Sequence, residues 1–171
     1  LRDVAPCGWV SVEPVEDGFD EETDIRVIRC SWDDVSPEKS PPKPTAPFKA
    51  LFWDIECYSR SGDFPVAKPM NAKDPGDPII QIGCVLKDLD GSIQKTIFVL
   101  DTCDNIPGVD VRFFPSEKEM LLAWFNWLIE VNPDIWVGYN IFGFDEKYLW
   151  HRSEVLKITM NDNLQKLSRL F

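Results

Sequence analysis

After residue 47 the spacing of apolar residues alternates between that of strands and that of helices. The order of these segments is compatible with few folds. Six periodic segments follow one another as three strands, a helix, a strand and a helix: 48–56, 78–88, 92–101, 117–131, 132–139 and 144–158. The second and third strands are separated by the turn sequence DLDG, which predicts an antiparallel hairpin. The helix between the third and fourth strands predicts a right-handed crossover that returns the fourth strand parallel to the first.

This βββαβα order predicts an α/β fold, namely the opening two-thirds of a ribonuclease-H-like sheet. Ser116 and Glu119 have the spacing of a capping box and should open the first helix. The residues expected on its buried face recur at helical spacing: Leu121, Trp124, Phe125, Leu128 and Ile129. The fourth strand is almost continuously apolar, which predicts a central parallel position.

The chain before this unit has a different composition. Residues 1–35 contain two β-like stretches divided by an acidic turn at 16–22, so they are expected to be part of a β-rich N-terminal domain. Residues 36–47 contain five prolines in twelve positions, which predicts an extended linker. The third region is 48–171. Because the chain opens on Leu1, we expect it to be an excerpt of something longer.

Three carboxylates are candidate metal ligands. Asp54 and Glu56 end the first strand on one face, whereas Ile55 points to the other face. Asp145 lies in the first turn of the helix that follows the parallel strand, where open α/β sheets place their ligands. Oxygen-only ligation favours Mg²⁺ or Mn²⁺. Two alternatives stay open at this point: a solvated strand end for the first two acids, and pairing with the helix dipole for Asp145.

The composition excludes several classes of protein. A net charge of −11 argues against an autonomous nucleic-acid-binding module, which would be basic, and it is compatible with a cation site. One histidine and five cysteines without a C-x-x-C pair argue against structural zinc and for a reducing, intracellular compartment. No apolar run approaches the ~18 residues of a membrane span, so no membrane partner is expected.

Two motifs carry a resemblance to a known family. FKALFWDIECYS at 48–59 and GYNIFGFDEKYL at 138–149 are similar to the first and second exonuclease motifs of family B DNA polymerases. The intervening DFP and DPGDPIIQIGCVL match that family's loop and second strand, and the region before the linker is similar to its β-rich N-terminal domain. The chain most resembles the delta-like enzymes of eukaryotes and large DNA viruses, and 48–171 then corresponds to a partial 3′→5′ exonuclease domain.

The resemblance implies a role for each residue of the site. Asp54 and Glu56 would hold the metal that activates the attacking water, with Asp54 bridging to a second metal that Asp145 supports. Asn140 and Phe144 would contact the single-stranded 3′ end. The implied activity is proofreading: two-metal-ion hydrolysis of the 3′-terminal phosphodiester of single-stranded DNA by a replicative DNA-directed DNA polymerase.

The resemblance also implies partners and a location. These are primer–template DNA, the remainder of the polymerase chain, and a sliding clamp or accessory subunit, in the nucleus or at a viral replication site. The family's third exonuclease motif, a tyrosine followed by aspartate four residues later, does not occur in this sequence. We therefore expect the isolated fragment to be nearly inactive.

Two other functions remain as alternatives to proofreading. The first is a non-catalytic scaffold with an exonuclease fold that binds DNA or a partner. The second is a stand-alone exoribonuclease of the same superfamily. The retained acids Asp54, Glu56 and Asp145 argue against the scaffold, and the β-rich N-terminal region argues against the exoribonuclease.

Overall fold

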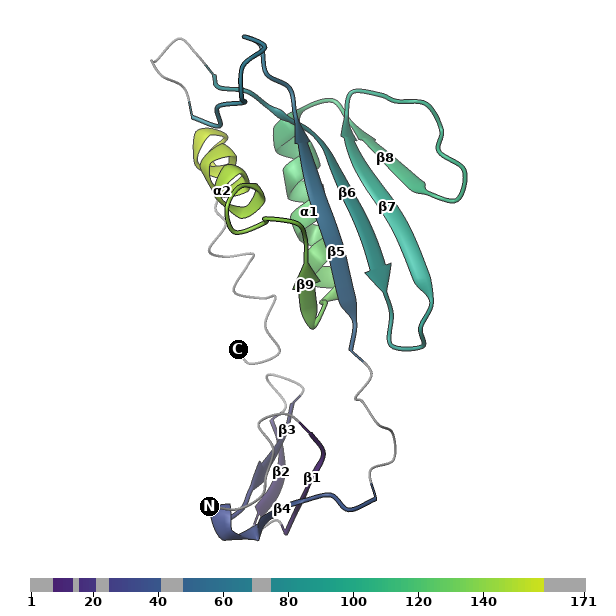
Figure 1. Ribbon diagram of the computed structural model, residues 1–171, viewed down its shortest axis with the longest axis vertical. Helices are drawn as coiled ribbons and strands as arrows, with labels where there is room; N and C mark the ends of the chain where they lie inside the picture. Colours follow the sequence, from purple (N-terminus) through teal and green to yellow (C-terminus); the bar gives the residue numbers. More distant parts are fainter. Residues whose placement is uncertain (1–7, 14–15, 21–24, 41–47, 69–74, 159–171) are drawn as a thin grey trace. The chain divides into compact units, whose positions relative to one another are not determined.

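The computed structural model describes residues 8–13, 16–20, 25–40, 48–68 and 75–158 (Figure 1). The described residues divide into two compact units, one before the proline-rich segment and one that begins at Phe48. Most of the proline-rich segment, 41–47, lies outside the described residues, as does 159–171. No helix in the described ranges is both long enough and apolar enough to cross a membrane.

The N-terminal unit contains two small antiparallel pairs and one short helix. Its elements are β1 (Val10–Val12), β2 (Glu16–Asp20), β3 (Ile25–Arg29), the 3₁₀ helix η1 (Trp32–Asp34) and β4 (Val35–Pro37). β1 pairs with β4, and β2 pairs with β3. The described strand residues are half-exposed or exposed, so these ribbons contain little core of their own.

Two predictions for this unit were wrong. Residues 16–20 of the acidic stretch expected to be a turn form β2, and Arg26 and Arg29 of β3 pair with Asp17 and Glu16 and offset its charge. The expected linker begins late, because Ser36 and Pro37 belong to β4. Proline is tolerated in such a two-stranded ribbon, where one side of each strand has no partner to receive an N–H.

The second unit is built on a mixed five-stranded sheet in the order β8-β7-β6-β5-β9. Its strands are β5 (Ala50–Cys57), β6 (Ile79–Lys87), β7 (Ile93–Leu100), β8 (Asp110–Phe114) and β9 (Ile135–Val137). β5, β6 and β7 form an antiparallel meander, as predicted. β9 runs parallel to β5, with Ala50 opposite Ile135, so the predicted pairing of the first and fourth strands is confirmed.

Two features of the sheet differ from the prediction. β8 was expected to be a connection because its surroundings are rich in Asn, Pro, Gly and Asp, yet it pairs parallel to β7. β9 was expected at the centre, but within the described residues it lies at one edge. Its apolar character has another cause, because the ring of Trp136 contacts Trp53 and Trp124 in the layer beneath the sheet.

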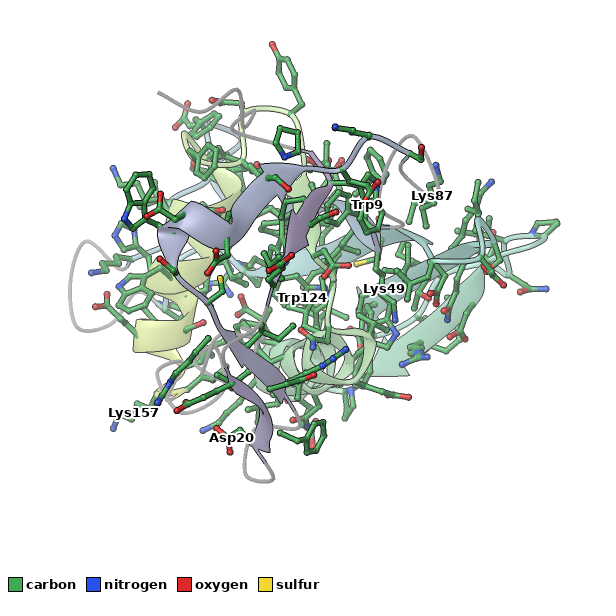
Figure 2. All side chains as sticks on the ribbon, turned by 90° about the horizontal axis from the view of Figure 1, so that it is seen from below. Trp9, Asp20, Lys49, Lys87, Trp124 and Lys157 are labelled. Atoms are coloured by element: carbon green, nitrogen blue, oxygen red, sulfur yellow. The ribbon has the colours of Figure 1, made fainter. Side chains whose placement is uncertain are left out.

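Helix α1 (Glu117–Val131) covers one face of the sheet and supplies much of the core. Ser116 caps the helix as predicted: its Oγ accepts from the Glu119 backbone N–H at 3.3 Å, and the Glu119 carboxylate accepts from the Ser116 hydroxyl at 2.8 Å. The helix ends at Asn132 in the left-handed region, followed by Pro133. Trp124 is fully buried and lies at the middle of the view in Figure 2, whereas the exposed Lys157 lies at its margin.

Helix α2 (Asp145–Val155) lies beside the C-terminal half of β5, beyond the point where β9 ends (Figure 1). β9 pairs only with the first residues of β5, up to Phe52. The edge of β5 after Phe52 is therefore open to the turn that leads into α2. This sheet with its crossover helix is the predicted ribonuclease-H-like arrangement, and it brings the start of α2 to the acidic end of β5.

Candidate active site

Strand β5 buries one face, and its two acidic side chains lie on the other face together with the exposed Phe52. Leu51, Trp53 and Ile55 are buried, whereas Asp54 and Glu56 are exposed. Asp54 lies opposite Gly83 of β6, and there is open space where a side chain at Gly83 would stand. The alternation predicted for this strand is confirmed, and both carboxylates face the side of the sheet that α1 does not cover.

Asp145 reaches β5 from the first residue of α2. Its side chain is 2% exposed, and Oδ1 accepts a hydrogen bond from the Ile55 backbone N–H at 3.1 Å. This N–H lies on the edge of β5 that β9 no longer covers. The carboxyl group of Asp145 thus replaces a missing strand partner, and it lies close enough to Asp54 for that acid's charge to act on it.

The environment of Asp145 disfavours its ionised form. Burial raises the pKa of this carboxyl, and the neighbouring charge of Asp54 raises it further, against the lowering effect of the Ile55 and Asp145 backbone N–H groups. A buried carboxyl beside a second carboxyl attracts cations, because a positive ion stabilises both ionised forms. The donor set of Asp54 and Asp145 is oxygen-only, which fits a hard divalent ion such as Mg²⁺ or Mn²⁺.

Glu56 lies on the same face but outside this pair. A register shift between Glu56 and Cys57 marks a bulge in the β5–β6 ladder, and bulges change the direction of the side chains beside them. Across the described residues, no three His, Cys, Asp or Glu side chains lie close enough together to hold a metal ion. The structure therefore brings together Asp54 and Asp145, and the participation of Glu56 stays a prediction.

The turn between β9 and α2 is set by two glycines and an asparagine. Asn140 has a left-handed backbone, with φ of 54°, and its carbonyl accepts from the Gly143 and Phe144 N–H groups at 2.9 and 3.1 Å. A Cβ on Gly138 would lie 2.1 Å from Ile141 Cγ2 and 2.9 Å from the Trp53 carbonyl oxygen. Asn140 therefore forms the turn that delivers Asp145, while its predicted contact with a strand end remains a prediction.

Phe144 belongs to an aromatic pair that the sequence analysis missed. Its ring lies edge-on to Phe64 at a centroid distance of 5.3 Å, and it also contacts Tyr148 at 5.2 Å. Phe64 is 75% exposed although it packs on Phe144, so one aromatic surface beside Asp145 faces solvent. A single phenylalanine within a polar loop, in the motif DFP, was the sequence signal for this residue.

The loop that carries Phe64 is attached to α2 by buried polar contacts. The Tyr148 hydroxyl donates to the Asp77 carbonyl at 3.0 Å, and the Asp77 carboxylate accepts from the Arg60 and Val66 N–H groups. Arg152 donates from Nη1 to the carbonyls of Ala67 and Pro75 at 3.0 and 2.6 Å. No role was predicted for Arg152. It lies four residues after Tyr148, so both side chains stand on one face of α2, and this spacing could have indicated a shared partner.

Asp54 is one of the residues that line a largely apolar groove. The groove has a volume of about 690 Å³ and lies over the sheet face opposite α1. Its lining comes from β5, β6, β7, β9 and the segment before β8, and it includes Phe52, Val85, Lys95 and Tyr139. This volume is within the range of ligand sites, and Lys95 contributes a positive charge to the wall.

Comparisons with known proteins agree on one family. The sequence profile "DNA polymerase family B, exonuclease domain" matches residues 1–171. The chain is 46% identical over 116 residues to the "DNA polymerase delta catalytic subunit" of Oryza sativa subsp. japonica, across 66% of this chain and 10% of that protein. It is 37% identical over 160 residues to the "DNA polymerase catalytic subunit" of rat cytomegalovirus, across 88% of this chain and 13% of that protein.

A solved structure shares the fold. The family B DNA polymerase from the hyperthermophilic archaeon Pyrobaculum calidifontis superposes with a TM-score of 0.57 at 23% identity, covering 92% of this chain and 17% of that one. The chain spans about a tenth of the length of the plant delta subunit that it matches. The ribonuclease-H-like fold and the resemblance to delta-like and viral polymerases, both predicted from the sequence, are confirmed.

Proposed function

The chain belongs to the family B DNA polymerases through their exonuclease domain, and on this basis we propose that it carries most of a 3′→5′ proofreading site. The observation that supports this proposal best is the hydrogen bond from the Ile55 N–H to Asp145, which brings this acid beside Asp54, an acid of a separate motif, where β9 leaves β5. The proposed reaction is hydrolysis of the 3′-terminal phosphodiester of single-stranded DNA in a replicative polymerase.

The acids of β5 and α2 would hold Mg²⁺ or Mn²⁺. When bound, such ions would supply an activated water and would stabilise the charge on the attacking and leaving oxygens of the phosphodiester. Asp145 is bonded to β5 at the residue next to Asp54, and Glu56 on the same face of β5 as Asp54 is the third proposed ligand. Repulsion keeps carboxylates apart, so a cation is the ligand that would draw Glu56 toward the pair.

Aromatic side chains would hold the strand end. The exposed ring of Phe64, supported by Phe144, offers a stacking surface that accepts any base, as removal of any misincorporated nucleotide requires. Asn140, exposed in the adjacent turn, is the proposed polar contact to the strand. The groove, which Asp54 helps to line, would provide a path by which a strand approaches the acids.

The setting of the reaction follows from the same proposal. An acidic chain binds DNA poorly by itself, so the primer–template would be held mainly by other parts of the polymerase. We propose that the protein acts inside the cell, in the nucleus or at a viral replication site. A sliding clamp or accessory subunit is a further proposed partner.

The test uses the full-length protein that contains this chain. The double substitution Asp54→Ala with Glu56→Ala should abolish Mg²⁺-dependent trimming of mismatched 3′ ends while polymerisation persists. The matched control is Asp88→Ala with Asp90→Ala, which removes two acids of the same spacing from the turn between β6 and β7. This control should trim at the unsubstituted rate.

The other outcomes separate the alternatives. Trimming that survives the Asp54 and Glu56 substitutions would show that the acids are not the site. A full-length protein that never trims DNA or RNA, yet binds DNA equally well before and after the substitutions, would identify the fold as a scaffold. Preferential trimming of RNA would identify an exoribonuclease.

A further inference from the structure

The guanidinium of Arg152 is buried at the junction of four segments. The residue is 3% exposed, and its nitrogens meet a carboxylate of α1 and two carbonyls of the loop between β5 and β6. Nε donates to Glu117 Oε1 at 2.8 Å, and Nη2 donates to Glu117 Oε2. Such a bidentate pair fixes the orientation of the guanidinium plane as well as its position.

Glu117 connects the same contact to the sheet. Its Oε1 accepts from the backbone N–H of Ile79, the first residue of β6, at 2.9 Å. Glu117 is 7% exposed and is the first residue of α1. The carboxylate is thus fixed by the start of a strand and by the start of a helix, and it in turn fixes Arg152.

The remaining guanidinium nitrogen, Nη1, faces the loop between β5 and β6. Nη1 donates to the Ala67 and Pro75 carbonyls, which lie on the two limbs of the loop, and so joins these limbs to α2. Gly76 packs tightly against this contact: a Cβ there would lie 2.7 Å from the Ala67 oxygen and 2.9 Å from Nη1, on a backbone with φ of 70°. No side chain fits between the loop and Arg152 at this point.

Phe64 lies on the limb of this loop that follows β5. Phe64 stands three residues before Ala67, and its ring meets Phe144 at the residue that precedes α2. The Phe64–Phe144 contact therefore joins the loop to the start of α2, next to Asp145. Arg152 joins the same loop to α2 seven residues further along the helix. Lysine at position 152 would keep the charge but lose the fork that reaches the carboxylate and both carbonyls together.

We propose that Arg152, oriented by Glu117, is a positioning residue that holds the two described limbs of the loop between β5 and β6 (58–68 and 75–78) against α2, so that Phe64 stands beside Phe144 and can receive a strand end. This inference rests on the proposed function, since it assumes that Phe64 contacts the single strand. It assigns Arg152 to substrate binding through Phe64, without any contact of its own with substrate or metal.

The experiment measures Mg²⁺-dependent hydrolysis of a single-stranded oligonucleotide by the full-length protein. Arg152→Lys and Gly76→Ala disturb the contact from its two sides. Each should raise KM by about tenfold and change kcat by less than about twofold, the pattern of lost substrate binding. Arg112→Lys is the matched control, because Arg112 pairs with Asp110 at the far edge of the sheet, and its KM should be unchanged.

A double-mutant cycle tests whether the effect acts through Phe64. Phe64→Ala alone should raise KM, and adding Arg152→Lys or Gly76→Ala to it should raise KM no further, because the residue being positioned is gone. Additive increases in KM would overturn the proposal. Loss of amide-exchange protection throughout β5 and β6 in both single variants would also overturn it, since Arg152 would then stabilise the whole unit.

Asp54→Ala in the same assay separates this inference from the proposed function. Hydrolysis that survives Asp54→Ala rejects the proposed function, whatever Arg152 does. Hydrolysis that requires Asp54 but keeps its KM in Arg152→Lys rejects only the positioning role.

Discussion

The backbone N–H of Ile55 donates to Asp145 Oδ1 at 3.1 Å, so the carboxyl that lies beside Asp54 also holds helix α2 to strand β5. One side chain thereby has two tasks, a structural one and a proposed chemical one. The structural task needs only an acceptor oxygen, whereas the chemical task needs a negative charge. Asparagine at position 145 would supply the acceptor oxygen without the negative charge, so this substitution separates the two tasks.

We predict that Asp145→Asn stabilises the unit in EDTA and abolishes trimming. The pKa of Asp145 is raised above its ordinary value of 3.8, chiefly by burial, so ionising it costs folding free energy. The stability of the unsubstituted protein should fall as pH rises from 3.8 through this raised pKa, and Asp145→Asn should remove that fall. Amide exchange of β5 peptides, followed across pH, measures the difference.

Two controls accompany this prediction. Asp54→Asn should weaken the pH dependence without removing it, because the Asp54 charge is a smaller cause of the shift than burial. Asp110→Asn, which changes an exposed acid paired with Arg112, should leave the pH dependence of β5 intact. Equal β5 protection in the Asp145→Asn and unsubstituted proteins at every pH would contradict the proposed cost of the charge.

A second prediction concerns the cysteines beside and beneath the site. Burial raises the pKa of Cys57 and of Cys84 to about 12, so neither thiol forms appreciable thiolate near pH 8. Iodoacetamide should therefore alkylate the half-buried Cys103 in the native protein before either of them. Peptide mass spectrometry after timed alkylation measures the order, and a fully unfolded sample, in which all three react alike, is the control.

A third prediction concerns the turn that delivers Asp145. Gly138→Ala should cost about 1–3 kcal/mol, because its Cβ would lie 2.9 Å from the Trp53 carbonyl, a backbone atom that cannot move away cheaply. It should also lower trimming, since relieving the clash shifts Asp145 relative to Asp54. Gly83→Ala is the matched control, with open space at its Cβ, and should leave β5 exchange unchanged.

Local patterns predicted the acids well and the loop attachments poorly. The period-2 alternation of β5 placed Asp54 and Glu56 on one face, and the parallel pairing of β5 with β9 brought Asp145 to that edge. Arg152 and Glu117, by contrast, lie 35 residues apart on different helices. No repeat within either segment encodes that contact, because it depends on how the two helices pack around the loop.

Contacts between distant segments also account for the two differences in the sheet. β8 has the composition of a connection, and its strand conformation comes from hydrogen bonds to β7. β9 was placed centrally because its residues are apolar, but apolar residues also suit an edge strand that packs on tryptophans. Periodicity reports which face is buried, and it does not report which neighbour buries it.

The last prediction tests the core that supports the acidic face. Trp124 is fully buried, its ring contacts Trp53 at 5.2 Å and Trp136 at 6.3 Å, and its Nε1–H donates to Cys84 Sγ at 3.3 Å. Trp124→Ala should therefore lower the free energy of unfolding of the unit by about 3–5 kcal/mol, through lost burial and the cavity that remains. Amide exchange of α1 in the full-length protein measures this loss.

Trp150→Ala is the matched control, because Trp150 is 44% exposed on α2 and the same truncation there should cost less than about 1 kcal/mol. Since Trp53 neighbours Asp54 in β5, loosening its packing partner should also make trimming more temperature-sensitive, while polymerisation by the rest of the protein keeps its temperature dependence. Equal exchange of α1 in both tryptophan variants would contradict the assignment of Trp124 to the centre of the core.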